Sequence, residues 1–292
     1  IVYYRTLSVS KPIRLFTEVA TKIGSGDFDA QLPPAGNSYE IDHLTHSFAA
    51  MQKSLKKYIK NLEITNAEKN RILAEVQVAS EIQRKLIPEN TEHPYQIKEI
   101  RCYGILEPAG EIGGDLYDFF PADESHFFFV IADVAGKGIV ASMTMIMVST
   151  YLRTISTYNY TANEIMKNLN NFLCKQSSAA IFVTALIGII DLRNDELEFS
   201  NAGHTPLFLR KLNGTYEIFA DTHSNPLGVF ENMEIGSSQL KLDKGDELIL
   251  LTDGVTETMN EKEEFLGLKG VESIIQNLKT SNPEQTAKQI MQ

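Results

Sequence analysis

The sequence predicts an α+β protein with a helical N-terminal third and a C-terminal domain of antiparallel sheets packed face to face, with helices outside them. Three observations lead to this prediction. Apolar residues recur with heptad spacing from residue 41 to residue 86. Beyond residue 93 the apolar period becomes that of strands. The helical segments there come in pairs among or after the strands, which disfavours a doubly wound fold.

A first helix is expected from about residue 9 to residue 23. Its apolar face is marked by residues three or four positions apart: Val9, Pro12, Phe16, Val19 and Ile23. Gly24-Ser-Gly-Asp27 ends the helix. Residues 24–40 also contain Pro33-Pro34 and Asn37-Ser38, so they are predicted to form an extended connector.

Residues 41–86 carry an unbroken heptad repeat and predict a long coiled-coil helix that begins near Glu40. The a positions are Ile41, Phe48, Leu55, Leu62, Lys69, Val76 and Gln83, and the d positions are Leu44, Met51, Tyr58, Thr65, Ile72, Ala79 and Leu86. Polar residues at Thr65, Lys69 and Gln83 predict a seam that is weak in its middle and just before the next domain.

Helix, connector, helix and coiled coil in this order resemble the HAMP signalling module, which directly follows the membrane helix of bacterial receptors. The resemblance rests on Pro12, on the helix exit at residues 24–28, and on Glu40-Ile-Asp-His-Leu44 followed by Phe48 and Met51; Asp42 stands where this family often has Gly. A plain helical hairpin that merely dimerises is the alternative. Ile1-Val-Tyr-Tyr-Arg5 is interpreted as the cytoplasmic end of a membrane helix.

The C-terminal part is predicted to be rich in strands. Strands are expected at residues 97–106, 116–120, 126–133, 181–191, 196–200, 206–212, 216–219, 234–242 and 247–251, and helices at 139–155, 162–173, 268–278 and 284–291.

Three acidic residues, Asp115, Asp133 and Asp253, stand beside glycines at the edges of apolar runs. An Asp beside a Gly is also common in ordinary turns. However, a carboxylate that ends an apolar run is costly unless it is paired or bound to a cation. Three of them together predict a site for a hard divalent cation with oxygen ligands.

Composition excludes several functions. Lys plus Arg number 27 against 38 Asp plus Glu, and the net charge of -11 argues against a nucleic-acid surface. Cys102 and Cys174 lie far apart without a zinc or phosphatase motif. Ala135-Gly-Lys-Gly138 lacks two required positions of a nucleotide-binding P-loop.

Several ordered motifs resemble the SpoIIE/RsbU branch of the metal-dependent type 2C serine/threonine phosphatases. They are Glu111-Ile-Gly-Gly-Asp-Leu-Tyr-Asp118, Ala132-Asp-Val-Ala-Gly-Lys-Gly138, Phe182-Val-Thr184, Asn201-Ala-Gly-His-Thr-Pro206, Pro226-Leu-Gly228 and Thr252-Asp-Gly-Val-Thr-Glu257, and Ala79-Ser-Glu-Ile-Gln-Arg-Lys-Leu-Ile-Pro88 resembles the linker helix that leads into that domain. The resemblance implies an αββα sandwich.

The resemblance also implies two Mn²⁺ or Mg²⁺ ions held by Asp115, Asp133, the Val134 carbonyl and Asp253. Glu111, Asp118, Gly114 and His204 are the further residues expected near the ions, with His204 either a general acid or a structural turn residue. The implied reaction is hydrolysis of phosphoserine or phosphothreonine by a water between the metals, without a protein nucleophile. Oxygen ligands favour Mg²⁺ and Mn²⁺ over zinc.

The expected organisation is a HAMP domain at residues 1–62, a coiled-coil linker at 63–92 and a phosphatase domain at 93–292. We expect a signal-regulated phosphatase that forms homodimers through its HAMP domain and coiled coil, is tethered to the cytoplasmic face of a bacterial membrane, and acts on a phosphorylated STAS-domain anti-sigma-factor antagonist. The alternative is a weakly catalytic scaffold. The resemblance further leads us to expect a closing C-terminal strand with an acidic pair beyond Gln292.

Overall fold

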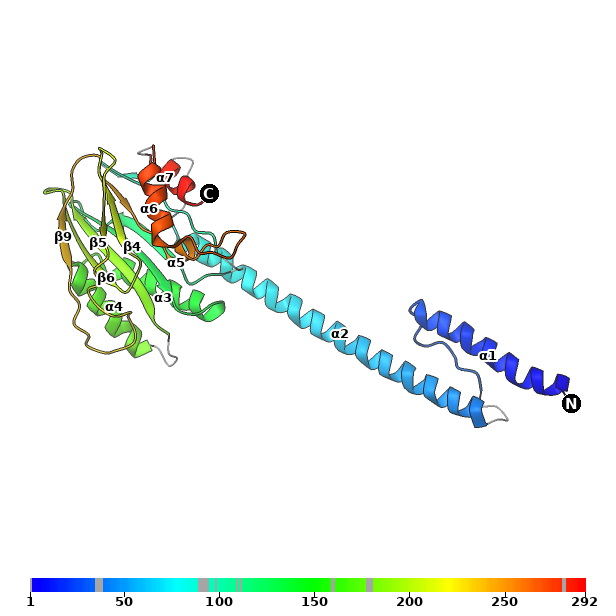
Figure 1. Ribbon diagram of the computed structural model, residues 1–292. Helices are drawn as coiled ribbons and strands as arrows, with labels where there is room; N and C mark the ends of the chain where they lie inside the picture. The colour runs from blue at the N-terminus through cyan, green and yellow to red at the C-terminus, as the bar shows by residue number, and fades with distance from the viewer. Residues whose placement is uncertain are drawn as a thin grey trace. The chain divides into compact units, whose positions relative to one another are not determined.

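The computed structural model describes residues 2–34, 39–88, 95–97, 99–108, 110, 112–158, 161–176, 181–279 and 282–292, without the side chains of residues 2–9, 95 and 97. The chain divides into two compact units, Ile1–Glu75 and Val76–Gln292 (Figure 1). Each unit is described by itself below.

The first unit consists of helix α1 (Val2–Gly24), a connector and the greater part of helix α2 (Tyr39–Leu86). Val19, Ile23 and Ala30 are buried, and Phe48 and Leu55 of α2 pack against them. The connector is tied to α2 by Gln52, whose side-chain amide donates to the Ala30 carbonyl at 2.8 Å. This packing confirms the expected helix-connector-helix order, with Ile1 and residues 35–38 outside the description.

Helix α2 is continuous over the whole predicted heptad repeat. Its seam is covered near the start, where Ile41 is buried, and exposed farther along, where Tyr58 and Ile72 are 65% and 50% exposed. An apolar seam left open in one chain is the surface that a second helix covers in a coiled coil. No helix in the described residues is long and apolar enough to cross a membrane.

The second unit contains two main antiparallel sheets within the described residues. The first has the order β3-β4-β5-β6-β9, the second has the order β10-β7-β8, and β1 pairs with β2 beside them. The strands are β1 (Tyr95–Ile97), β2 (Ile100–Cys102), β3 (Leu116–Pro121), β4 (His126–Val134), β5 (Val183–Asp191), β6 (Glu196–Ala202), β7 (Leu207–Arg210), β8 (Tyr216–Phe219), β9 (Ser238–Lys241) and β10 (Glu247–Ile249).

Helices cover the outer face of each sheet, as Figure 1 shows. Helices α3 (Ile139–Ile155) and α4 (Ala162–Gln176) pack on the first sheet through a core that includes Met145, Leu152 and Leu169. Helices α6 (Gly267–Asn277) and α7 (Pro283–Ile290) pack on the second sheet through Val271 and Ile275 of α6 and Ile290 of α7. The layers are therefore helix, sheet, sheet, helix, as predicted.

Alternation along β4 explains how one strand serves two cores. Phe127 and Phe129 face the second sheet, whereas Phe128 and Val130 face α3 and α4. Gly188 lies opposite Phe129, and a Cβ there would stand 2.1 Å from the Phe129 ring, so only glycine admits the ring. Each buried phenylalanine contributes roughly 1.5–3 kcal/mol relative to an exposed one.

Most predicted elements are present, with shifted ends. The expected strand at 97–106 is short, because β2 ends at Cys102. The expected strand at 234–242 is confined to β9, and that at 247–251 ends at Ile249. A short helix, α5 (Asp253–Thr256), was not predicted, and it places Asp253 at a helix start instead of a strand end.

Candidate metal centre

The three predicted acidic residues come from both sheets. Asp115 immediately precedes β3, and Asp133 is the next-to-last residue of β4. These strands pair antiparallel with Leu116 opposite Ala132, so Asp115 and Asp133 meet at one end of the first sheet. Asp253 reaches them from the second sheet, as the first residue of α5 four positions after β10.

Asp115 and Asp133 share a side-chain hydrogen bond. Burial, then the Asp115 carboxylate and the charge of Asp253, together raise the pKa of Asp133 to about 7. Burial also raises the pKa of Asp115, against the hydrogen bonds from Asp133 and Thr252. Because both pKa values are raised, the pair holds a proton at a pH where a solvent-exposed aspartate has lost it.

Thr252 holds Asp115 in place. Its hydroxyl donates to a carboxylate oxygen of Asp115 at 3.1 Å, and Thr252 directly precedes Asp253. The contact therefore joins the chain ahead of β3 to the chain after β10, that is, the two sheets. No role was predicted for Thr252, although it stands between an apolar run and Asp253 in a predicted motif.

The acidic cluster fits a hydrated divalent cation. Burial and the neighbouring carboxylates raise the pKa values of Asp115 and Asp133, and no lysine or arginine is among the causes found in the described part of the chain. Within that part, no three His, Cys, Asp or Glu side chains converge on one ion position. Mg²⁺ commonly uses one or two carboxylates and keeps several waters, so the pair suffices for one ion.

Gly114 lets the loop before β3 approach the predicted ligand carbonyl of Val134. A Cβ at Gly114 would stand 2.7 Å from the Val134 oxygen and 3.4 Å from the Ala141 side chain. Gly114 was predicted to lie near the ions. It is the residue that brings Asp115 and Val134 together without a side chain between them.

The structure gives Asp118 a different role from the predicted support of the ions. Its carboxylate is 2% exposed and binds the Arg153 guanidinium through two hydrogen bonds of 2.7 and 2.8 Å. The Phe119 N–H donates to the same carboxylate at 2.8 Å. Asp118 thus ties β3 to α3. Glu111, the other predicted neighbour, lies outside the described residues.

Gln83, predicted to be a polar seam residue, is instead buried against the acidic loop. Its side-chain nitrogen donates to the Gly113 carbonyl at 2.7 Å, and its oxygen accepts from the Gly113 N–H at 3.4 Å. Gly113 stands two residues before Asp115. The last turns of α2 therefore support the loop that carries the first acidic residue.

His204 lies in the connection between β6 and β7 and is buried. Burial lowers its pKa to about 4, so the ring is neutral near pH 7. Its Nδ1 lies 3.0 Å from the Thr184 hydroxyl, and Thr184 is opposite Asp133 in the β4–β5 register. Its Nε2 has no hydrogen-bond partner among the described residues. These contacts fit the structural interpretation of His204.

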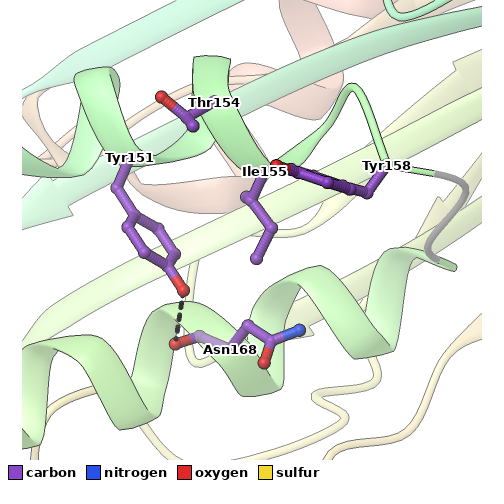
Figure 2. A pocket seen from close by; sticks show the side chains of 5 residues that line it. All are labelled: Tyr151, Thr154, Ile155, Tyr158 and Asn168. Atoms are coloured by element: carbon purple, nitrogen blue, oxygen red, sulfur yellow. Dashed lines mark hydrogen bonds between the residues drawn. The ribbon is translucent and has the colours of Figure 1, made fainter.

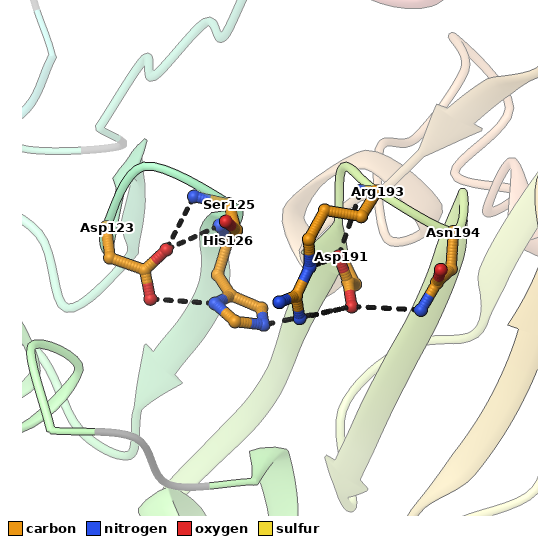
Figure 3. A network of polar contacts seen from close by, with 6 residues as sticks. All are labelled: Asp123, Ser125, His126, Asp191, Arg193 and Asn194. Carbon is orange, nitrogen blue, oxygen red and sulfur yellow. Dashed lines mark hydrogen bonds and ion pairs between the residues drawn. The ribbon is translucent and has the colours of Figure 1, made fainter.

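Two other polar features lie away from the acidic cluster. Figure 2 shows a surface pocket between α3 and α4, where the Tyr151 hydroxyl donates to the Asn168 carbonyl at 3.3 Å. Figure 3 shows a network at the other ends of β4 and β5, where His126 lies opposite Asp191. Hydrogen bonds from Arg193 lower the pKa of Asp191 to about 2. Neither feature contains a predicted site residue.

Comparison with known families assigns both parts of the chain. The family described as Stage II sporulation protein E (SpoIIE) matches residues 123–292, and the HAMP domain family matches residues 6–57. The phosphoserine phosphatase RsbU of Bacillus subtilis is 28% identical over 221 residues, which cover 75% of this chain and 64% of that relative. Protein IcfG of Synechocystis is 28% identical over 285 residues, 88% of this chain and 44% of that protein. The chain thus spans less than two thirds of either relative.

Solved structures confirm the fold. The SiaA-PP2C domain of Pseudomonas aeruginosa superposes with a TM-score of 0.63 at 17% identity, over 77% of this chain and 89% of that one. The phosphatase domain of SpoIIE from Bacillus subtilis, with a fragment of its regulatory domain, gives 0.55 at 23% identity, over 62% and 53%. At these identities the likeness concerns the fold alone.

Proposed function

Because the chain belongs to the SpoIIE family, we propose that it is a signal-regulated protein phosphatase that hydrolyses phosphoserine or phosphothreonine with two Mn²⁺ or Mg²⁺ ions. The observation that carries the proposal is the partly buried pair Asp115 and Asp133 beside Asp253, where the pKa of Asp133 is raised to about 7. Similarity to a relative named a phosphoserine phosphatase supports the same reaction.

Each residue of the cluster has a distinct part in this proposal. Asp115, Asp133, the Val134 carbonyl and Asp253 would hold the cations, which when bound lower the pKa of a water ligand and neutralise phosphoryl oxygens. Asp115 and Asp133 would both have to be ionised to hold a cation, so binding would release the proton of the pair. Thr252 keeps Asp115 oriented, because its hydroxyl occupies one carboxylate oxygen.

The proposed substrate is a phosphorylated STAS-domain protein of the anti-sigma-factor-antagonist class. Support comes from the family and from the relatives named phosphoserine phosphatases RsbU and RsbP. A folded phosphoprotein should be hydrolysed faster than a phosphoserine peptide cut from it. Equal rates on both would remove the support for a docked protein substrate.

We also propose the division into a HAMP domain at residues 1–62, a linker at 63–92 and a phosphatase domain at 93–292. The open seam of α2 supports homodimerisation through the HAMP domain and coiled coil. The HAMP match supports tethering of the whole protein to the cytoplasmic face of the membrane.

The exposed seam of α2 also favours the alternative of a weakly catalytic scaffold that acts through dimerisation. Hydrolysis of p-nitrophenyl phosphate with Mn²⁺, and after its removal by EDTA, separates the two. A phosphatase hydrolyses the ester only with the metal. A scaffold dimerises in both conditions and releases no phosphate above background in either.

A further inference from the structure

The connection from β6 to β7 carries the chain from the first sheet to the second, beside the acidic cluster. The Asn201 side chain makes two hydrogen bonds with the backbone of His204. Its oxygen accepts from the His204 N–H at 2.8 Å, and its nitrogen donates to the His204 carbonyl at 3.2 Å. Asn201 is fully buried. Gly203, with φ of 71°, adopts a left-handed conformation that favours glycine. The turn is therefore a rigid element.

The His204 side chain of this turn contacts the first sheet. Its Nδ1 lies 3.0 Å from the Thr184 hydroxyl on β5. Thr184 is directly opposite Asp133, and the next residue, Ala185, forms a bridge with Gly203 of the turn. The turn is thus fixed to the part of the first sheet that carries Asp133.

The next side chain, Thr205, contacts the segment after the second sheet. Its hydroxyl donates to the Leu251 carbonyl. Leu251 directly precedes Thr252, which binds Asp115, and lies two residues before Asp253. This short turn therefore contacts two segments: strand β5, which pairs with the strand that carries Asp133, and the segment that leads to Asp253.

We propose that the turn from Asn201 to Thr205 is a spacer that sets the separation of Asp133 and Asp253, with His204 and Thr205 as positioning residues that touch neither cation nor phosphate. The inference rests on the proposed function. In the described strands, no ladder of hydrogen bonds joins the five-stranded sheet to the three-stranded one. Side-chain packing alone would let the sheets slide, whereas ligand geometry must hold within about 0.5 Å.

The test is Mn²⁺ affinity, measured by calorimetry on the whole chain without substrate, together with the melting temperature and the phosphatase rate. Thr205→Val removes the hydroxyl but keeps the shape, and we expect it to weaken Mn²⁺ binding by about tenfold, as loss of a supporting hydrogen bond at metal sites does. Thr205→Ser keeps the hydroxyl and should stay within about twofold of that affinity. Thr184→Val, which removes the His204 contact, should resemble Thr205→Val.

Ser200→Ala is the matched control. Ser200 is also fully buried on β6, and its hydroxyl donates to a backbone carbonyl, that of Gly236, at 2.8 Å. Its loss should lower the melting temperature and leave Mn²⁺ affinity unchanged. The spacer proposal is contradicted if Thr205→Val and Thr184→Val bind Mn²⁺ with the affinity of the unsubstituted chain. It is also contradicted if Ser200→Ala weakens Mn²⁺ binding as much as those two variants do.

If Thr205→Val does not fold, the comparison of Mn²⁺ affinity rests on Thr184→Val, which should bind more weakly, and Thr205→Ser, which should bind as the unsubstituted chain does. An unsubstituted chain that binds Mn²⁺ without hydrolysing phosphoserine contradicts the proposed function, while the variants still test the spacer. A chain that binds no Mn²⁺ contradicts both.

Discussion

At the scale of single residues, the acidic cluster is held at a cost to stability. Asp133 is partly buried beside two other carboxylates, and its pKa is raised to about 7. Folding therefore disfavours its charged form. Because the folded-state pKa lies above the usual 3.8, this cost is absent below about pH 3.8, grows as the pH rises from there, and is complete above about pH 7.

The change Asp133→Asn should raise the melting temperature of the metal-free chain at pH 8, because it removes a buried charge beside Asp115 and Asp253. At pH 5 only the first part of this cost has developed, because the folded carboxyl is protonated and the pH lies little above 3.8, so the gain should be smaller. Thermal unfolding in EDTA at both pH values measures the difference. If the variant were less stable than the unsubstituted chain at pH 8, the charge of Asp133 would not be destabilised by Asp115 and Asp253.

Sequence patterns located Asp115, Asp133 and Asp253, because a carboxylate beside glycine at the end of an apolar run is a local feature. They did not locate Thr252 as a partner of Asp115, since that contact spans 137 positions. The ion pair of Asp118 was not predicted, for the same reason. Its partner, Arg153, is 35 positions away on a helix whose contacts no local pattern shows.

At the scale of elements, α2 belongs to both units, and its last turns support the acidic loop through Gln83. The heptad repeat predicted the helix over nearly its full length, because periodicity is a property of neighbouring residues. It did not predict that Gln83 would leave the seam. The repeat assigns a position within the helix but not the surface that the helix contacts.

Gln83→Leu should destabilise the second unit by about 1–3 kcal/mol, because the Gly113 carbonyl and N–H lose their partner. Urea unfolding measures this change. Arg84→Leu is the control, since Arg84 is exposed one position farther along the same helix. Equal stability of the two variants would mean that the Gln83 contact contributes nothing.

Lys69→Leu tests the proposal that the coiled coil regulates the phosphatase. Lys69 is an exposed polar residue at an a position, and leucine there should tighten a parallel dimer. If the seam is bistable, locking it should also change the phosphatase rate. Sedimentation equilibrium and phosphate release measure the two effects. Tighter dimers with an unchanged rate would contradict regulation through the seam.

At the scale of the whole molecule, the two sheets meet where their chains present acidic residues, and the helices cover the outer faces. The predicted layers were confirmed because alternation in β4 and β5 encodes two buried faces. The approach of Asp253 to Asp115 and Asp133 depends on how the sheets pack. That packing is a tertiary property, so the sequence pattern predicted one site for the three carboxylates but not the elements that bring them near one another.

The central claim is that carboxylates from both sheets form one divalent-metal phosphatase site. The most direct measurement is Mn²⁺-dependent phosphate release from a phosphoserine protein by the unsubstituted chain, Asp133→Asn and Asp253→Asn, each checked for folding by its melting temperature. We predict release by the unsubstituted chain that requires Mn²⁺, and loss of at least about a hundredfold in both folded variants, since each removes a proposed cation ligand. Full activity in either folded variant, or release that persists without Mn²⁺, would contradict the claim.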